Sequence, residues 1–220
     1  MNTLDYHPDQ PSIHRTDREE FWNFATHATA CLLSIGEAAV MIPAFSDKPL
    51  LLFLSGIVFS ILQVALYACS ALSHYFRDPR LRSLFRRLDQ AVIYLFIAAS
   101  YTPCSLAVQD DSSWWWWVLS GIWLLAIAGF VSKLVYAHRV EYVAVWIYLA
   151  LGWATAAGGL PFSGLLPAPA LCWMVLGGIL YSAGTWFLIH DRRRWYFHAI
   201  WHLFVLAGST THFLAMMIYI

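Results

Sequence analysis

Long apolar stretches separated by short polar joints make up nearly the whole chain. A helix needs about 20 mostly apolar residues to cross about 30 Å of hydrocarbon, and seven stretches of the sequence reach that length. The pattern predicts an all-α polytopic membrane protein, a single bundle of seven transmembrane helices. The predicted spans are residues 23–45, 50–73, 89–108, 114–135, 140–160, 169–189 and 197–219.

The chain divides into a polar start and an apolar body. Residues 1–22 read as an N-terminal tail, and residues 23–220 read as the transmembrane domain. Within the tail, Thr16 and Glu19 have the spacing of a capping box, in which each side chain accepts a backbone N–H of the other residue. A helix is therefore expected to begin here, in the membrane interface, before the first span.

Composition supports the membrane class. Of the 220 residues, 60% are hydrophobic and only 12% are charged, whereas about 25% of a soluble domain is charged. The formal net charge is zero, so the chain lacks the basic excess that marks a nucleic-acid-binding protein.

The placement of basic residues sets the expected orientation. Lysine and arginine gather on the cytoplasmic side of membrane proteins, and seven spans put all but one of the 13 basic residues on one side. The N-terminus is therefore expected in the cytoplasm and the C-terminus outside. The exception is Lys48, and the residues on the common side are Arg15, Arg18, Arg77, Arg80, Arg82, Arg86, Arg87, Lys133, Arg139, Arg192, Arg193 and Arg194.

Candidate chemistry lies at the cytoplasmic ends of three predicted spans. His198 and His202 open the last span, and their spacing of four puts both on one helical face. His74 ends the second span and Asp89 opens the third. Although these residues are far apart in sequence, the predicted topology gives all of them a similar depth.

Three neutral imidazoles suit Zn²⁺, and a fourth position left for water is the pattern of a catalytic zinc site. Asp89 would either ligate the ion directly or hold the bound water. Ser70, one turn before His74, would offer a hydroxyl to that water or to a substrate carbonyl. The plainer alternative is that these histidines are interfacial or hydrogen-bonded, since the HxxxH pair lacks the glutamate of HExxH proteases.

Other polar residues near this depth have weaker claims. Glu20, Asn23 and His27 share a face of the first helix at the cytoplasmic boundary. They form either a second shell of the site or a structural network that ties the first helix to the bundle. His212 lies ten residues beyond His202, about 15 Å along the helix, and is expected to hydrogen-bond between helices instead.

Eight short motifs follow one another along the chain. They are residues 20–27, 70–74, 88–94, 100–103, 148–153, 178–184, 198–202 and 208–213. Their order resembles the hemolysin III family, and the resemblance covers roughly residues 15–220, although Gln90 stands where the family commonly has histidine. The family is similar to the progestin and adipoQ receptors, which are seven-helix proteins with zinc near the cytoplasmic face.

The resemblance implies a ligand set and a location. It implies Zn²⁺ held by His74, His198 and His202, with Asp89 on a zinc-bound water and Ser70 nearby. It also implies an integral protein of the bacterial inner membrane.

Three functions stay open from the sequence. The first is a zinc-dependent hydrolase that cleaves an amide or ester of a membrane lipid, with Asp89 as general base. The second is a non-enzymatic sensor or regulator of membrane lipid state, in which zinc is structural. The third, which the family name suggests, is cytolysis.

Overall fold

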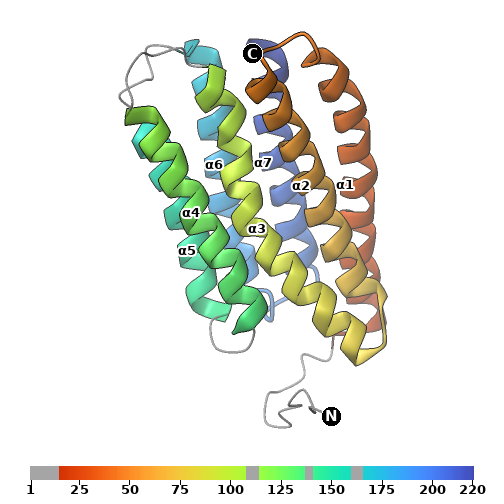
Figure 1. Ribbon diagram of the computed structural model, residues 1–220. Coiled ribbons are helices and arrows are strands. Elements are labelled where there is room, and N and C mark those ends of the chain that lie inside the picture. The colour runs from red at the N-terminus through yellow and green to blue at the C-terminus, as the bar shows by residue number, and fades with distance from the viewer. Residues whose placement is uncertain (1–14, 108–113, 137–140, 160–165) are drawn as a thin grey trace, which may run out of the picture.

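The computed structural model describes residues 15–107, 114–136, 141–159 and 166–220. Within these ranges the chain forms seven helices and no strand (Figure 1), which confirms the all-α prediction. The helices are α1 (Asp17–Ala44), α2 (Leu50–Tyr75), α3 (Pro79–Ala107), α4 (Trp114–Val135), α5 (Glu141–Gly159), α6 (Ala168–Ile189) and α7 (Phe197–Tyr219).

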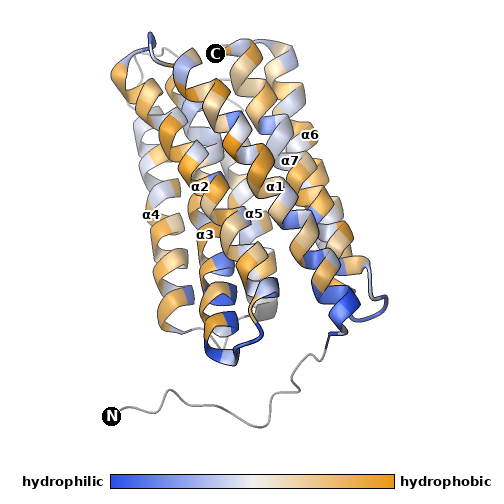
Figure 2. Ribbon diagram, turned by 90° about the vertical axis from the view of Figure 1, so that its right-hand side faces the viewer, coloured by the Kyte–Doolittle hydropathy of each residue, from blue (hydrophilic) through white to orange (hydrophobic). Residues whose placement is uncertain are grey.

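The helices have the length and composition of membrane spans. Among the described residues, six are long and apolar enough to cross a bilayer, and α5 contributes a shorter apolar stretch, Val145–Ala154. Apolar residues line most of each helix, and polar residues gather at the lower ends of α1 and α3 (Figure 2). The chain is therefore an integral membrane protein, and the seventh span remains a prediction.

The first helix begins where the sequence predicts. Thr16 caps α1: its hydroxyl accepts the backbone N–H of Glu19 at 3.3 Å, and Glu19 Oε2 accepts the backbone N–H of Thr16 at 2.6 Å. This reciprocal pair satisfies two N–H groups that a helix start otherwise leaves free. The helix consequently starts at Asp17, six residues before the predicted apolar span.

The joint between the second and third spans is much shorter than the sequence pattern suggests. Residues 79–88 are helical, and α3 begins at Pro79. Asp78 starts the helix, since its Oδ1 accepts the backbone N–H groups of Arg80 at 2.9 Å and of Leu81 at 3.0 Å. Arginine is a good helix former, so a run rich in arginine extends the helix beyond the membrane span.

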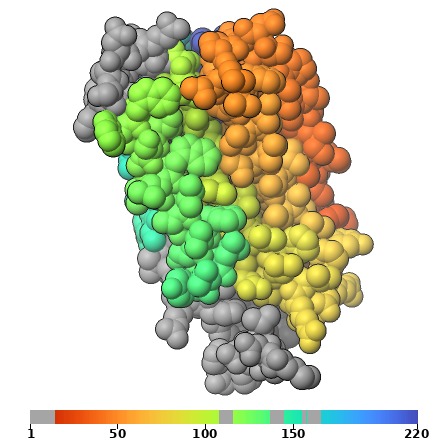
Figure 3. Space-filling model, in the orientation of Figure 1, coloured from red at the N-terminus to blue at the C-terminus, as the bar shows by residue number. Residues whose placement is uncertain are grey.

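Helix α3 occupies the middle of the bundle. It packs against α2, α4, α5 and α7, while α1 closes the bundle by packing against α2 and α7. The starts of α1, α3 and α7 and the end of α2 meet at one end of the molecule (Figure 1). At that end the first turns of α3 form part of the surface beside α2 (Figure 3).

Glycines allow α6 and α7 to approach closely. A Cβ at Gly184 of α6 would lie 2.6 Å from the Cβ of Phe204, and a Cβ at Gly208 of α7 would lie 2.8 Å from the Tyr181 ring. Small residues at such contacts are common where membrane helices pack backbone to backbone. The position of α7, and of the histidines on it, therefore depends on these glycines.

We expect Gly184→Ala to destabilise the protein by about 1–3 kcal/mol, because the added methyl group must displace a neighbouring helix. A thermal unfolding curve of the purified protein in detergent measures the loss. Gly121→Ala on α4 is the matched control, since a Cβ there meets nothing within 4 Å. Equal midpoints for the two variants would contradict the packing argument.

The basic asymmetry predicts orientation. A reporter inserted in the joint that contains Arg77 should give a cytoplasmic signal, and one inserted beside Lys48 should give an external signal. These positions lie at opposite ends of α2, so the pair tests one helix directly. The reverse result would place the histidine end of the bundle outside the cell.

Candidate metal centre

Three histidines converge at the end of the bundle where α2 stops and α7 starts. His74 lies in the last turn of α2, and His198 and His202 lie in the first two turns of α7. One potential ligand atom from each residue lies within 4.8 Å of the other two. Among the described residues, these three histidines are the group that could hold a metal ion. The ring centroids are 4.6 to 5.3 Å apart.

In each histidine the Nδ1 atom faces an oxygen. The Nδ1 of His74 lies 2.7 Å from Glu20 Oε2 on α1. The Nδ1 of His202 lies 3.1 Å from the backbone oxygen of Asn23 and 2.9 Å from the Thr26 hydroxyl. The Nδ1 of His198 lies 3.3 Å from Asp191 Oδ2, in the turn between α6 and α7.

This arrangement decides which nitrogen can bind a metal. Carboxylate and carbonyl oxygens only accept hydrogen bonds, so the Nδ1 atoms of His74 and His202 carry the proton and their Nε2 atoms keep a lone pair. Histidine ligands of zinc are held in this way, with the second nitrogen donating to a carboxylate or a backbone carbonyl. The Nδ1 of His198 faces both an acceptor, Asp191, and a donor, Arg15, so these contacts do not fix its tautomer. The three residues fit a Zn²⁺ ion that His74 and His202 would bind through Nε2.

Asp191 is a charged partner for His198. Burial by itself would raise the pKa of the Asp191 carboxyl, but the hydrogen bond with His198 and the nearby positive charge of Arg15 bring that pKa below its usual value. Asp191 is therefore a carboxylate at neutral pH. Arg15 Nη2 contacts Asp191 Oδ2 at 2.5 Å and lies 3.2 Å from the Nδ1 of His198.

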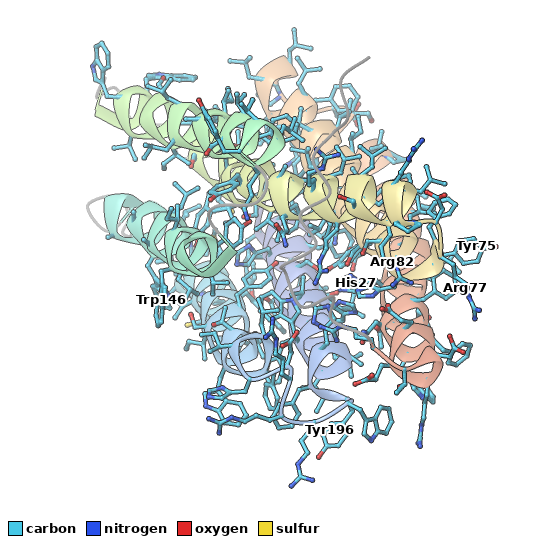
Figure 4. All side chains as sticks on the ribbon, turned by 90° about the horizontal axis from the view of Figure 1, so that it is seen from below. His27, Tyr75, Arg77, Arg82, Trp146 and Tyr196 are labelled. Carbon is cyan, nitrogen blue, oxygen red and sulfur yellow. The ribbon has the colours of Figure 1, made fainter. Side chains whose placement is uncertain are left out.

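The three α1 residues expected near the site, Glu20, Asn23 and His27, contact the histidines in different ways. Glu20 contacts His74 through its carboxylate, whereas Asn23 reaches His202 only through its backbone oxygen. His27, which is labelled in Figure 4, stacks on the His202 ring with a centroid distance of 3.6 Å. Both nitrogens of His27 and the side-chain amide of Asn23 are buried without a hydrogen-bond partner among the described residues.

The histidines line a cavity of about 320 Å³ that also holds Ser70 and Asp89. Ser70 is buried and Asp89 is half-buried, and the two interact electrostatically. Asp89 does not belong to the group whose ligand atoms lie within 4.8 Å of one another. Asp89 thus lines the same cavity as the histidines but does not belong to the group of possible metal ligands.

His212 lies outside the histidine group, as expected. Its Nε2 lies 3.2 Å from the backbone oxygen of Met174, which joins α7 to α6. It also lines the cavity, away from the end where α7 begins. The prediction of a hydrogen bond between helices is confirmed.

Three partners of the ligand histidines escape sequence reasoning. Asp191 and Arg15 hold His198, and Thr26 holds His202. Asp191 precedes His198 by one heptad in a polar turn, which is a weak signal. Arg15 and Thr26 are about 180 residues from the histidines they contact, and nothing in the local sequence indicates those contacts.

Comparison with known proteins agrees with this architecture. A family model described as Haemolysin-III related matches residues 16–213. The chain is 32% identical to Hemolysin-3 of Bacillus cereus over 204 residues, which is 92% of each chain. It is 30% identical to the monocyte to macrophage differentiation factor of Homo sapiens over 161 residues, which is 71% of this chain and 66% of that one.

A plant protein is more distant. The heptahelical transmembrane protein ADIPOR2 of Oryza sativa subsp. japonica is 25% identical over 180 residues, which is 72% of this chain and 79% of that one. The fold and these matches define a helical integral membrane protein related to the progestin and adipoQ receptors. The chain belongs to the haemolysin III family.

The histidine geometry predicts the effect of removing a ligand. Purified protein should carry about one zinc, and His202→Ala should lose it, because two imidazoles alone hold the ion far more weakly. Mass spectrometry of the metal content measures occupancy, and the unfolding midpoint should fall with it, since binding energy is also folding energy.

His212→Ala is the matched control, because it removes a buried imidazole from the same helix at a different depth. It should leave zinc occupancy unchanged. Full occupancy in His202→Ala would contradict the ligand assignment.

Proposed function

We propose that the protein is a zinc-dependent hydrolase that cleaves an amide or ester of a membrane lipid. The observation that carries the proposal is a cavity lined by Asp89, by Ser70 and by three histidines whose possible ligand atoms lie within 4.8 Å of one another. A carboxylate beside a three-histidine group is a set of residues suited to hydrolysis. The site lies within a bundle of membrane helices, which favours a lipid as the substrate.

Each residue has a role in such a reaction. A zinc ion held by the three histidines would supply a Lewis acid that polarises a carbonyl and makes water more acidic. Asp89 is the general base that accepts a proton from the attacking water and returns it to the leaving group. Ser70, which interacts with Asp89, orients the water or donates to the carbonyl oxygen.

A second function has its own supporting observation. The ligands stand on α2 and α7, and their Nδ1 partners come from α1 and from the turn after α6. A metal at this point would tie four parts of the chain together, as a structural zinc does. The protein would then act as a non-enzymatic sensor or regulator of membrane lipid state.

The proposal includes an orientation. We infer seven spans with the N-terminus in the cytoplasm and the C-terminus outside, in the plasma membrane of a bacterium. The basic residues at the histidine end support this orientation. The printed description of the rice relative as heptahelical supports the number of spans. The site would then lie near the cytoplasmic face.

Asp89→Asn separates the two functions. An amide does not accept a proton at neutral pH, so the variant should keep zinc but lose at least about a hundredfold of any lipid hydrolysis. Release of fatty acid from membrane lipids by the purified, zinc-loaded protein measures the activity, and metal content is measured on the same sample.

Ser70→Ala provides a graded comparison, because another water partly replaces a hydroxyl that only orients water. It should reduce hydrolysis in the same direction but less. Unchanged hydrolysis in zinc-loaded Asp89→Asn would exclude Asp89 as the base. The structural role would be favoured by two results together. The zinc-loaded wild type would hydrolyse no lipid, and Asp89→Asn would keep any phenotype that the wild-type protein gives in cells.

A further inference from the structure

Arg86 is a charged side chain at the edge of the histidine site. It lies on α3, is half-buried and lines the cavity of the histidine site. Its side chain forms no hydrogen bond or ion pair within the described residues, although it acts electrostatically on both Asp89 and His74. A guanidinium stays charged and offers five N–H donors, so a partly buried one is stable only beside an acceptor.

Neighbouring arginines at this end already have their acceptors. Arg15 is paired with Asp191 at 2.5 Å, and Arg82 lies 3.6 Å from Glu20 and donates to a backbone oxygen at 2.9 Å. The carboxylates of Asp191 and Glu20 are thus engaged by other arginines. Arg86 differs from those arginines because it lines the cavity and forms no hydrogen bond or ion pair with the described residues, which leaves room for an anion that the protein does not itself supply.

Two arginines line the charged end of the cavity. They are Arg86 and Arg192, and of the two carboxylates that also line it, Asp89 and Asp191, the second is already paired with Arg15. A divalent ion on the histidines would add two positive charges at this end. Guanidinium groups bind phosphate through paired hydrogen bonds, which makes a phosphate the anion that suits two arginines best.

Beyond these charges the cavity becomes apolar and long. The α3 residues that line it follow one another at intervals of about a helical turn, from Arg86 through Ile93 and Phe96 to Tyr101. Fifteen residues of helix correspond to about 22 Å. A cavity of about 320 Å³ that α3 lines over this length, mostly with apolar side chains, suits an alkyl chain with its head at the arginines.

We propose that the ligand of this cavity is a lipid with one alkyl chain and a phosphate headgroup, with the phosphate on Arg86 and Arg192 and the chain along α3. Asp89 lies one helical turn beyond Arg86, so the linkage between headgroup and chain falls beside Asp89 and the histidines. The inference rests on the proposed function only where it takes the bound lipid to be the substrate as well.

Binding of an ether lipid tests the proposal without any reaction. The probe is 1-O-hexadecylglycerol 3-phosphate, which has no carboxylic ester or amide to hydrolyse, added to the zinc-loaded protein in nanodiscs of zwitterionic lipid. Arg86→Gln and Arg192→Gln should each weaken its binding about tenfold or more, because each removes a charged hydrogen-bonding group. Arg80→Gln, an exposed arginine outside the cavity, should bind like the wild type.

Two further probes identify which part of the ligand is recognised. Phosphate-free 1-O-hexadecylglycerol should bind more weakly, with equal affinity for the wild type and both variants. Inorganic phosphate should compete only at far higher concentration than the ether lipid. Equal affinity for the two hexadecyl compounds, or for free phosphate and the ether lipid, would overturn the proposal. So would equal binding of the ether lipid by wild type, Arg86→Gln and Arg192→Gln.

The inference and the proposed hydrolase fail in different ways. If the ether lipid binds through both arginines but the matching ester lipid is not cleaved, the result supports the binding site and contradicts the proposed hydrolase. If neutral ester lipids are cleaved equally by the wild type and Arg86→Gln, the hydrolase stands and the headgroup assignment falls. Arg192 lies in the exposed turn after α6, so its variant keeps the test valid even if Arg86→Gln does not fold.

Discussion

A polar side chain in the apolar thickness of a membrane has to find its partner within the protein, because hydrocarbon offers no hydrogen bonds. This constraint shapes the interface of α1, α2 and α7. At the histidine end, oxygens from α1 and the α6–α7 turn hold each Nδ1. Farther along α1, Glu37 accepts hydrogen bonds from Gln63 at 2.7 Å and Thr210 at 3.2 Å. The same three helices thus meet at two polar contacts.

The histidine contact also separates two chemical tasks. Oxygen partners fix the orientation of each ring, and this leaves the opposite nitrogen free to face the cavity. A bare cluster of imidazoles would have no reason to keep one tautomer. Here the backbone oxygen of Asn23 fixes the tautomer of His202, and the Glu20 carboxylate fixes that of His74, before any ligand binds. Preorganisation of this kind suits a scaffold and a catalyst equally, which is why Asp89 rather than the histidines distinguishes the two.

Much of the fold can be predicted from the sequence, because a membrane helix needs a long apolar stretch that is easy to recognise. Apolar length predicts the helices, and the Thr16–Glu19 capping box predicts the start of α1. The spacing of His198 and His202 places both on one face. Successive spans cross the membrane in opposite directions, so the predicted topology also gives the depth of the other site residues. It puts His74 of α2 at the depth of the two histidines of α7, and the three form one group in the structure.

Other features depend on tertiary contacts that local sequence does not encode. The arginine-rich run before Asp89 looks like a polar joint, yet Asp78 caps it and makes it helical. The pairing of Arg15 with Asp191 joins residues 176 positions apart, and no local pattern announces it. Among the described residues the apolar stretch of α5 is short. Hydropathy alone therefore does not identify α5 as a membrane span, and that assignment rests on the alternation of the spans.

The histidine cluster joins the beginning of the chain to its end, and this has a consequence for biosynthesis. Thr26 of α1 contacts His202 of α7, and 176 residues of synthesis separate them. At about 5–20 residues per second, the early helices wait on the order of ten seconds or more for their partner. Until α7 enters the membrane, His74 has Glu20 as a partner but lacks the two histidines of α7. A chain cut short before its last helix therefore keeps incompletely paired polar groups, which physically marks it as unfinished.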